Sequence, residues 1–89
     1  MVARHYIVKG RVQGVGFRYF TRRLAAELDI KGWVKNLENG AVEVHAEGDE
    51  KPMEQFFSDI KRGPSLAFVQ EVEAGEVEPE GYPDFSLEW

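Results

Sequence analysis

Apolar and polar side chains alternate near the start of the chain, in the segment RHYIVKGRV. One side of this pattern carries Tyr6, Val8, Gly10 and Val12, and the other carries His5, Ile7, Lys9 and Arg11. Because successive side chains of a β-strand point to opposite faces, this alternation is typical of a half-buried strand. The segment therefore predicts a first strand whose inner face contributes to a core.

Two other segments, GFRYFTRRLAAELD and GDEKPMEQFFSDIKRGP, have apolar residues at helical spacing. In the second segment Asp49 stands where an N-cap is expected, Pro52 is tolerated in a first turn, and Gly63-Pro64 would end the helix. Two helices are therefore predicted. The residues expected to face the core are Phe17, Phe20, Leu24, Ala25 and Leu28 in the first helix, and Met53, Phe56, Phe57 and Ile60 in the second.

The remaining segments have the patterns of strands. KGWVKNLENGAVEVHAEG contains two strand-like runs joined through Asn39-Gly40, a strong turn signal, and so predicts a hairpin. AFVQEVEAGEV predicts a strand of poorer alternation, and DFSLEW predicts a short final edge strand. The expected order is β-α-β-β-α-β with an extra C-terminal edge strand. Two helices on one face of an antiparallel-rich sheet make an α+β fold, the ferredoxin-like sandwich, which hosts many functions.

Composition narrows the class of protein. The 89 residues, 43% hydrophobic and 12% aromatic, can build one core, so we expect a single domain over residues 1–89. The apolar runs are far shorter than the roughly 20 residues of a membrane span, and no signal-peptide pattern is present, so we expect a soluble, cytoplasmic protein. The sequence has no cysteine, which excludes disulfides, zinc–thiolate sites and a cysteine-dependent phosphatase.

Charge is distributed unevenly along the chain. Residues 1–35 carry eight Lys or Arg and two Asp or Glu, a balance of +6, whereas residues 36–89 carry three basic and fourteen acidic residues, a balance of −11. Such charges often only cover solvated faces. As a binding signal, the pattern favours a small anion over a long polyanion, which the acidic remainder would repel.

The basic region surrounds GRVQGVGFRYF, which joins the first predicted strand to the first helix. This segment lacks the Gly-Lys-Ser/Thr ending of a Walker A loop, and Tyr19 stands where a dinucleotide fingerprint needs its third glycine. A short turn from Gln13 to Phe17 remains, whose glycines permit positive φ and place no Cβ before a ligand. Arg18 follows at the helix N-terminus, where the helix dipole and a planar guanidinium both suit phosphate. The alternative is an ordinary turn with a solvated arginine.

Asn36 ends the first strand of the predicted hairpin. In the ferredoxin-like topology this strand shares a sheet with the first strand, so its end can approach the turn at residues 13–17. An asparagine at a strand end often only starts a turn. A turn residue and a site residue are both consistent with this position.

Two stretches, GRVQGVGFR and GWVKNLENGAVEVHAEG, together resemble the signatures of the acylphosphatase family without a visible departure. The resemblance implies a phosphate-binding loop with Arg18 as its charged clamp, and an attacking water held by Asn36. The loop would consist of Gln13, Gly14, Val15, Gly16, Phe17 and Arg18. It also implies hydrolysis of acyl phosphates, such as acetyl, carbamoyl or aspartyl phosphates, to carboxylate and inorganic phosphate. Family members typically act as small monomers and need no metal or other cofactor.

So sparse a site suits an acyl phosphate. Its carboxylate leaves readily, so the reaction needs mainly positioning and charge stabilisation, which loop amides and a guanidinium supply. An asparagine can orient water without titrating. No metal cluster is evident, because His45 has only Glu43 and Glu47 near it and no second histidine at ligand spacing. His45 and Trp33 are both expected on the helix-free face of the sheet, and His45 on an open part of it.

Two other functions compete with this hypothesis. Ferredoxin-like domains can bind RNA by stacking bases on aromatic residues exposed on the central strands. The outward positions here carry no aromatic pair, so we expect no nucleic-acid partner. The second alternative is a catalytically idle acylphosphatase-like domain with a regulatory role, and the presence of both Arg18 and Asn36 argues against it.

Overall fold

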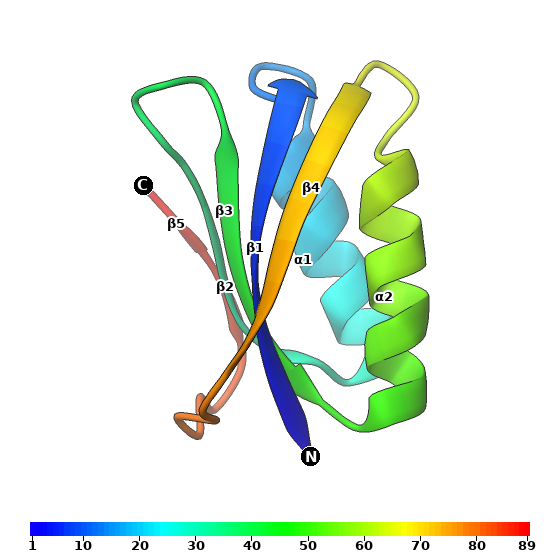
Figure 1. Cartoon of the computed structure of the whole chain (residues 1–89), viewed down its shortest axis with the longest axis vertical. Coiled ribbons are helices and arrows are strands. Elements are labelled where there is room, and N and C mark those ends of the chain that lie inside the picture. Colours follow the sequence, from blue (N-terminus) through cyan, green and yellow to red (C-terminus); the bar gives the residue numbers. More distant parts are fainter.

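The computed structural model describes all residues from Met1 to Trp89. Its elements follow the predicted order (Figure 1). They are β1 (Val2–Arg11), α1 (Phe17–Leu28), β2 (Lys31–Asn36), β3 (Val42–Gly48), α2 (Glu50–Arg62), β4 (Phe68–Val77) and β5 (Phe85–Glu88). The sequence-based prediction of β-α-β-β-α-β with an extra C-terminal strand is confirmed. None of the helices is long and apolar enough to cross a membrane.

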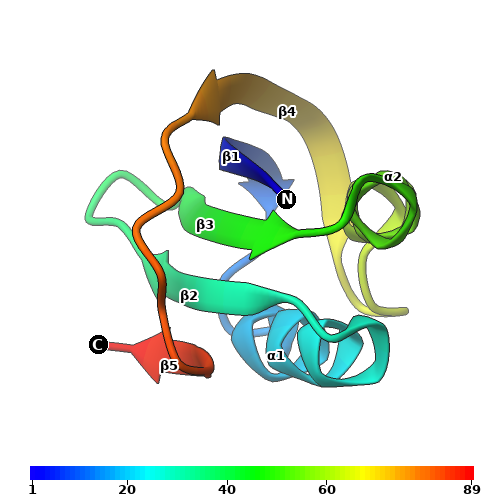
Figure 2. The same cartoon turned by 90° about the horizontal axis from the view of Figure 1, so that it is seen from below.

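The strands form one five-stranded sheet in the order β4-β1-β3-β2-β5. The pairs β4–β1, β1–β3 and β3–β2 are antiparallel, whereas β5 runs parallel to β2 at the edge. Both helices pack on one face of this sheet, as the end view makes clear (Figure 2). The ferredoxin-like α+β sandwich is therefore confirmed, including the edge position of the final strand.

The core lies between the sheet and the helices and uses the predicted inward faces. Tyr6 and Val8 of β1 and Phe56 and Ile60 of α2 are all 0% exposed. Phe17, the first residue of α1, is also buried in this cluster. Burial of large apolar side chains on both layers supplies the main driving force for folding, and it anchors the start of α1 in the core that β1 also lines.

The predicted turn at Asn39-Gly40 fixes the far end of β2. Gly40 adopts a φ of 95°, and the Asn39 Oδ1 accepts a hydrogen bond from the Ala41 N–H at 3.0 Å. The Leu37 N–H donates to the Ala41 carbonyl at 2.9 Å and closes the hairpin. Because the turn is held at both ends, the position of Asn36, the last residue of β2, is well defined.

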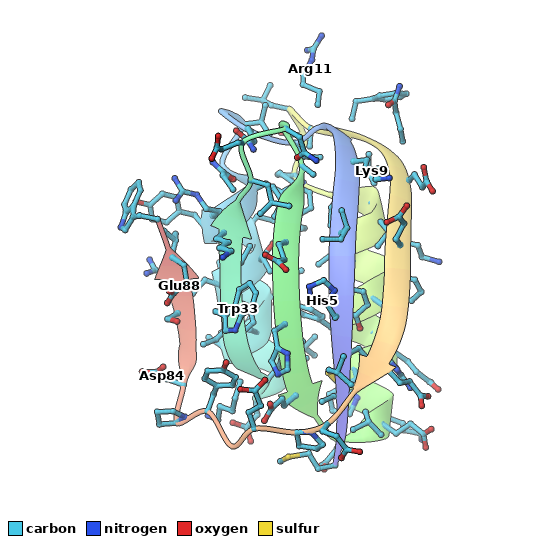
Figure 3. All side chains as sticks on the ribbon, turned by 60° about the vertical axis from the view of Figure 1, so that its left-hand side comes forward. His5, Lys9, Arg11, Trp33, Asp84 and Glu88 are labelled. Carbon is cyan, nitrogen blue, oxygen red and sulfur yellow. The ribbon has the colours of Figure 1, made fainter.

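The face of the sheet away from the helices is only partly open. Trp33 lies on this face as predicted (Figure 3). His45 lies beneath it, but it is only 4% exposed, so the expectation of an open position is wrong. The reason is the connection between β4 and β5, whose Tyr82 ring centroid lies 5.3 Å from that of His45, while the Trp33 ring stacks at 6.0 Å.

Candidate active site

The loop between β1 and α1 begins the helix with glycine in a left-handed conformation. Gly14 and Gly16 have φ values of 74° and 79°, and Gly16 is the N-cap of α1. A Cβ at either position would meet nothing within 4 Å, so glycine is needed here for its backbone conformation and not for space. No side chain caps the helix, which leaves the N–H groups of its first turn for an anion.

Gln13 ties this loop to the β2–β3 turn. Its side-chain Nε2 donates to the Leu37 carbonyl at 2.7 Å and to the Ala41 carbonyl at 2.8 Å. Gln13 was expected in the loop, but the sequence pattern indicates no separate role for its side chain. The two bonds explain how the loop and the end of β2, distant along the chain, hold a fixed relative position.

Arg18, in the first turn of α1, is held by the end of β5. Its Nη1 donates to the Glu88 carbonyl at 3.0 Å, and its Cζ lies 4.3 Å from the centroid of the Trp89 ring. The view with side chains places Glu88 near the end of the edge strand (Figure 3). Both contacts restrict the long arginine side chain, which otherwise has considerable rotamer freedom. Neither partner of Arg18 is indicated by the sequence pattern.

Asn36 carries a buried oxygen without a partner. Its backbone belongs to β2 and pairs with Val42 of β3, while its Oδ1 is buried and accepts no hydrogen bond from the protein. Most buried polar side-chain atoms in proteins have a hydrogen-bond partner, and leaving one without a partner costs free energy. An orphan acceptor of this kind is typical of a position that bonds a ligand or a water molecule during function.

Arg18 and Asn36 meet in one pocket of about 210 Å³. The pocket brings together residues from the loop, the start of α1 and the end of β2. They are Val12, Gly14, Gly16, Phe17, Arg18, Tyr19 and Asn36. Of the residues predicted for the site, Gln13 and Val15 do not line the pocket: the Gln13 side chain supports the turn, and Val15 packs against the core.

Two other hollows lie near this pocket, and neither contains both Arg18 and Asn36. One of about 610 Å³ shares Asn36 with the pocket and is bounded on the other side by Trp89. A larger one of about 850 Å³ runs along α1 past Arg22 and Arg23 but contains neither Arg18 nor Asn36. We assign the site to the smaller pocket, because only there do a guanidinium, glycine backbone and an unpartnered amide converge.

A glycine-rich strand–loop–helix junction with one arginine and one asparagine, built on this sandwich, belongs to the class of sites that bind a small phosphate group. Comparison with known proteins identifies the family. The acylphosphatase family model matches residues 4–87. The chain therefore belongs to the acylphosphatase family.

Individual acylphosphatases match this chain over nearly their whole length. The chain is 52% identical to the acylphosphatase of Archaeoglobus fulgidus over 87 residues, which cover 98% of each protein. It is 50% identical to the acylphosphatase of Thermotoga maritima over 82 residues, or 92% of this chain and 91% of the relative. Among solved structures, the crystal structure of acylphosphatase from Bacillus subtilis matches with a TM-score of 0.97 at 40% identity, covering 100% of both chains.

Proposed function

We propose that this protein hydrolyses acyl phosphates to carboxylate and inorganic phosphate, with the phosphoryl group bound by the loop at residues 13–18. Membership of the acylphosphatase family supports the reaction. The observation that supports the site is that Asn36, whose buried Oδ1 has no hydrogen-bond partner, lines the same pocket as Arg18.

Arg18 and the loop amides would bind the phosphoryl oxygens. A guanidinium carries several N–H donors in one plane, and only Nη1 is engaged, with the Glu88 carbonyl. The remaining donors can bind two phosphate oxygens side by side, which a point charge cannot do. Charge that spreads over the equatorial oxygens in the transition state is stabilised by donors already in place.

Asn36 would position the attacking water. Its Oδ1 can accept a hydrogen bond from that water and so direct a lone pair of the water oxygen toward phosphorus. The Oδ1 has no hydrogen-bond partner within the protein. An amide does not ionise near neutral pH, so it orients the water without removing its proton. The good carboxylate leaving group makes this sufficient, because little protonation is required as the P–O bond breaks.

We propose that residues 1–89 act as a single domain and as a cytoplasmic monomer, on small acyl phosphates and without a nucleic-acid partner. The charges on the helix-free face of the sheet support the absence of a nucleic-acid partner. On this face the Glu43 carboxylate is hydrogen-bonded to His5 at 2.6 Å. The Glu73 carboxylate accepts a hydrogen bond from Lys9 at 2.7 Å. Those basic groups are therefore paired internally and are less available to a nucleic-acid backbone.

The direct test is hydrolysis of benzoyl phosphate by the purified protein in the presence of EDTA. We expect turnover of this acyl phosphate and negligible turnover of p-nitrophenyl phosphate, a monoester with a poorer leaving group. Arg22→Ala serves as a matched control for Arg18→Ala, because Arg22 lies one turn further along α1 and does not line the pocket. Equal losses in the two variants, or no turnover by the parent, would contradict the proposal.

A further inference from the structure

Two buried titratable side chains, His45 and Glu47, lie in hydrogen-bond contact on the helix-free face and do not line the pocket that contains Arg18. The Nε2 of His45 and the Oε2 of Glu47 are 2.7 Å apart, and their side chains are 4% and 1% exposed. Two titratable groups are seldom buried to this degree on a sheet face unless they satisfy other polar groups. The site chemistry described above uses neither of them.

Glu47 uses its carboxylate to hold the backbone of residues 78–84, which we call the strap. Its Oε2 accepts a hydrogen bond from the Glu80 N–H at 2.6 Å, and its Oε1 accepts one from the Gly81 N–H at 3.0 Å. Tyr82 adds a third attachment, because its hydroxyl accepts a hydrogen bond from Trp33 Nε1 at 3.1 Å. The strap crosses the sheet from β4 at one edge to β5 at the other (Figure 2).

The strap determines where β5 begins. At its end the Asp84 carbonyl accepts a hydrogen bond from the Gly32 N–H at 2.9 Å, and β5 then pairs with β2 alone, over four residues. A short edge strand with one neighbour has little stability of its own. Its position and register therefore depend on the strap that precedes it as well as on the packing of Phe85 against the core.

The far end of β5 holds Arg18. Glu88 supplies the carbonyl that accepts the Arg18 hydrogen bond, and Trp89 supplies the ring beneath the guanidinium. A continuous series of contacts thus runs from the buried Glu47 carboxylate, through the strap and β5, to the arginine of the phosphate pocket.

We infer that Glu47 is a positioning residue for the site: by fixing the strap it sets the position of β5 and, through β5, that of the Arg18 guanidinium. The inference rests on the proposed role of Arg18 in binding phosphate. Carboxylate chemistry suits this task, since two oxygens can accept from two neighbouring backbone N–H groups and from His45 together. In the isosteric Glu47→Gln variant, the amide NH₂ would face the Glu80 N–H or the Gly81 N–H, and one donor would oppose another.

The test compares Glu47→Gln with Glu43→Gln. Glu43 is a matched control because it lies four residues away on the same strand and face, accepts a hydrogen bond from His5 at 2.6 Å, and does not contact the strap. At a temperature where both variants are folded, we expect Glu47→Gln to raise the inhibition constant of inorganic phosphate about threefold or more and to lower kcat/KM for benzoyl phosphate. Glu43→Gln should change neither. Hydrogen exchange of the β5 amides should accelerate in Glu47→Gln alone.

The outcomes separate this inference from the proposed function. If Glu47→Gln is less stable but binds phosphate like the parent, Glu47 serves stability only and the inference is wrong. If Glu47→Gln does not fold, Tyr82→Phe, which removes only the hydroxyl attachment of the strap, decides the question through the same phosphate measurement. Unchanged phosphate affinity there would also overturn the inference. Failure of the parent to bind phosphate would instead contradict the proposed function, while the β5 exchange rates would still report whether Glu47 holds the strap.

Discussion

Arg18 is hydrogen-bonded to the backbone carbonyl of Glu88, 70 residues further along the chain. The arginine comes from the first turn of the first helix, and its acceptor comes from the last strand. This hydrogen bond to the Arg18 side chain therefore forms only when β5 has paired with the edge of the sheet. This long-range dependence links the geometry of the site to the whole fold and leads to several measurable consequences.

The Arg18→Lys variant should lose most of its activity although its charge is retained. A lysine offers one point of charge and cannot bond the Glu88 carbonyl while presenting a planar pair of donors to phosphate. We expect kcat/KM to fall about tenfold or more, which corresponds to ~1.4 kcal/mol of transition-state stabilisation. Arg22→Lys is the control. Retention of kcat/KM within about threefold, or ~0.7 kcal/mol, would contradict a bidentate role for Arg18.

Inorganic phosphate should inhibit competitively and raise the melting temperature. A ligand that binds only the folded state stabilises it by mass action, and the pocket offers loop amides and Arg18 for this anion. A phosphate-free salt of matched ionic strength should have a smaller effect on both measurements. Arg18→Ala should abolish the stabilisation, and an equal phosphate effect in that variant would place the anion elsewhere.

Gly16 should tolerate asparagine better than alanine. Its φ of 79° belongs to the left-handed region, and a Cβ there would meet nothing within 4 Å. The cost of substitution is therefore backbone strain of about 1 kcal/mol for alanine, and less for asparagine, which adopts this conformation more readily. Thermal unfolding of the two variants measures the difference. Equal destabilisation, or a loss well above about 2 kcal/mol for both, would indicate steric crowding that the structure does not contain.

The alternation and helical spacing of apolar residues predicted all seven elements and the layer that each helix covers, because those patterns are local. The partner of β5 was not predictable in the same way. DFSLEW is compatible with any free edge, and its parallel pairing with β2 follows from the length of the strap and the packing of Phe85 against the core. Arg18 and Asn36 were proposed as site residues from their motifs, but the contacts of Arg18 with Glu88 and Trp89 depend on that pairing.

Glu47 illustrates a second limit of sequence reasoning. An acidic residue in an alternating strand is expected on the exposed face, and Glu47 does point away from the helices. Its burial arises because the backbone of the strap at Glu80 and Gly81 lies against its carboxylate. No pattern within β3 itself indicates that a connection from a different part of the chain will cross above this strand.

Glu47 should make stability depend on pH in a defined direction. Burial alone would raise the pKa of the Glu47 carboxyl, but hydrogen bonds from His45, Glu80 and Gly81 outweigh burial and hold that pKa below its usual value. Because the folded pKa is the lower one, the stabilisation is complete above the ordinary glutamate pKa and is lost as the pH falls through the folded value. The free energy of unfolding of Glu47→Gln should lie about 2 kcal/mol below that of the parent at neutral pH.

Denaturant titrations of the parent and Glu47→Gln at a series of pH values check this dependence. The difference between the two proteins should be nearly constant from neutral pH down to about 5 and should shrink at lower pH. Glu43→Gln again serves as the control on the same strand. A difference that stays constant into the acid range, or that increases there, would mean that the ionised carboxylate is not what holds the strap.

Asn36→Ala should separate catalysis from phosphate binding and from folding. If Asn36 holds the attacking water, its loss should lower kcat and kcat/KM together by on the order of 10² to 10³, while the inhibition constant of phosphate stays near that of the parent. The melting temperature should change little, because the Oδ1 that is removed has no hydrogen-bond partner to lose and the backbone pairing of β2 with β3 is retained.

Three measurements on the Asn36→Ala variant therefore distinguish three roles of Asn36. Lost turnover with an equal loss of phosphate affinity would make Asn36 a phosphate ligand, and lost turnover with a collapsed melting curve would make it a structural turn residue. Only lost turnover with normal phosphate binding and normal unfolding agrees with an asparagine that positions water.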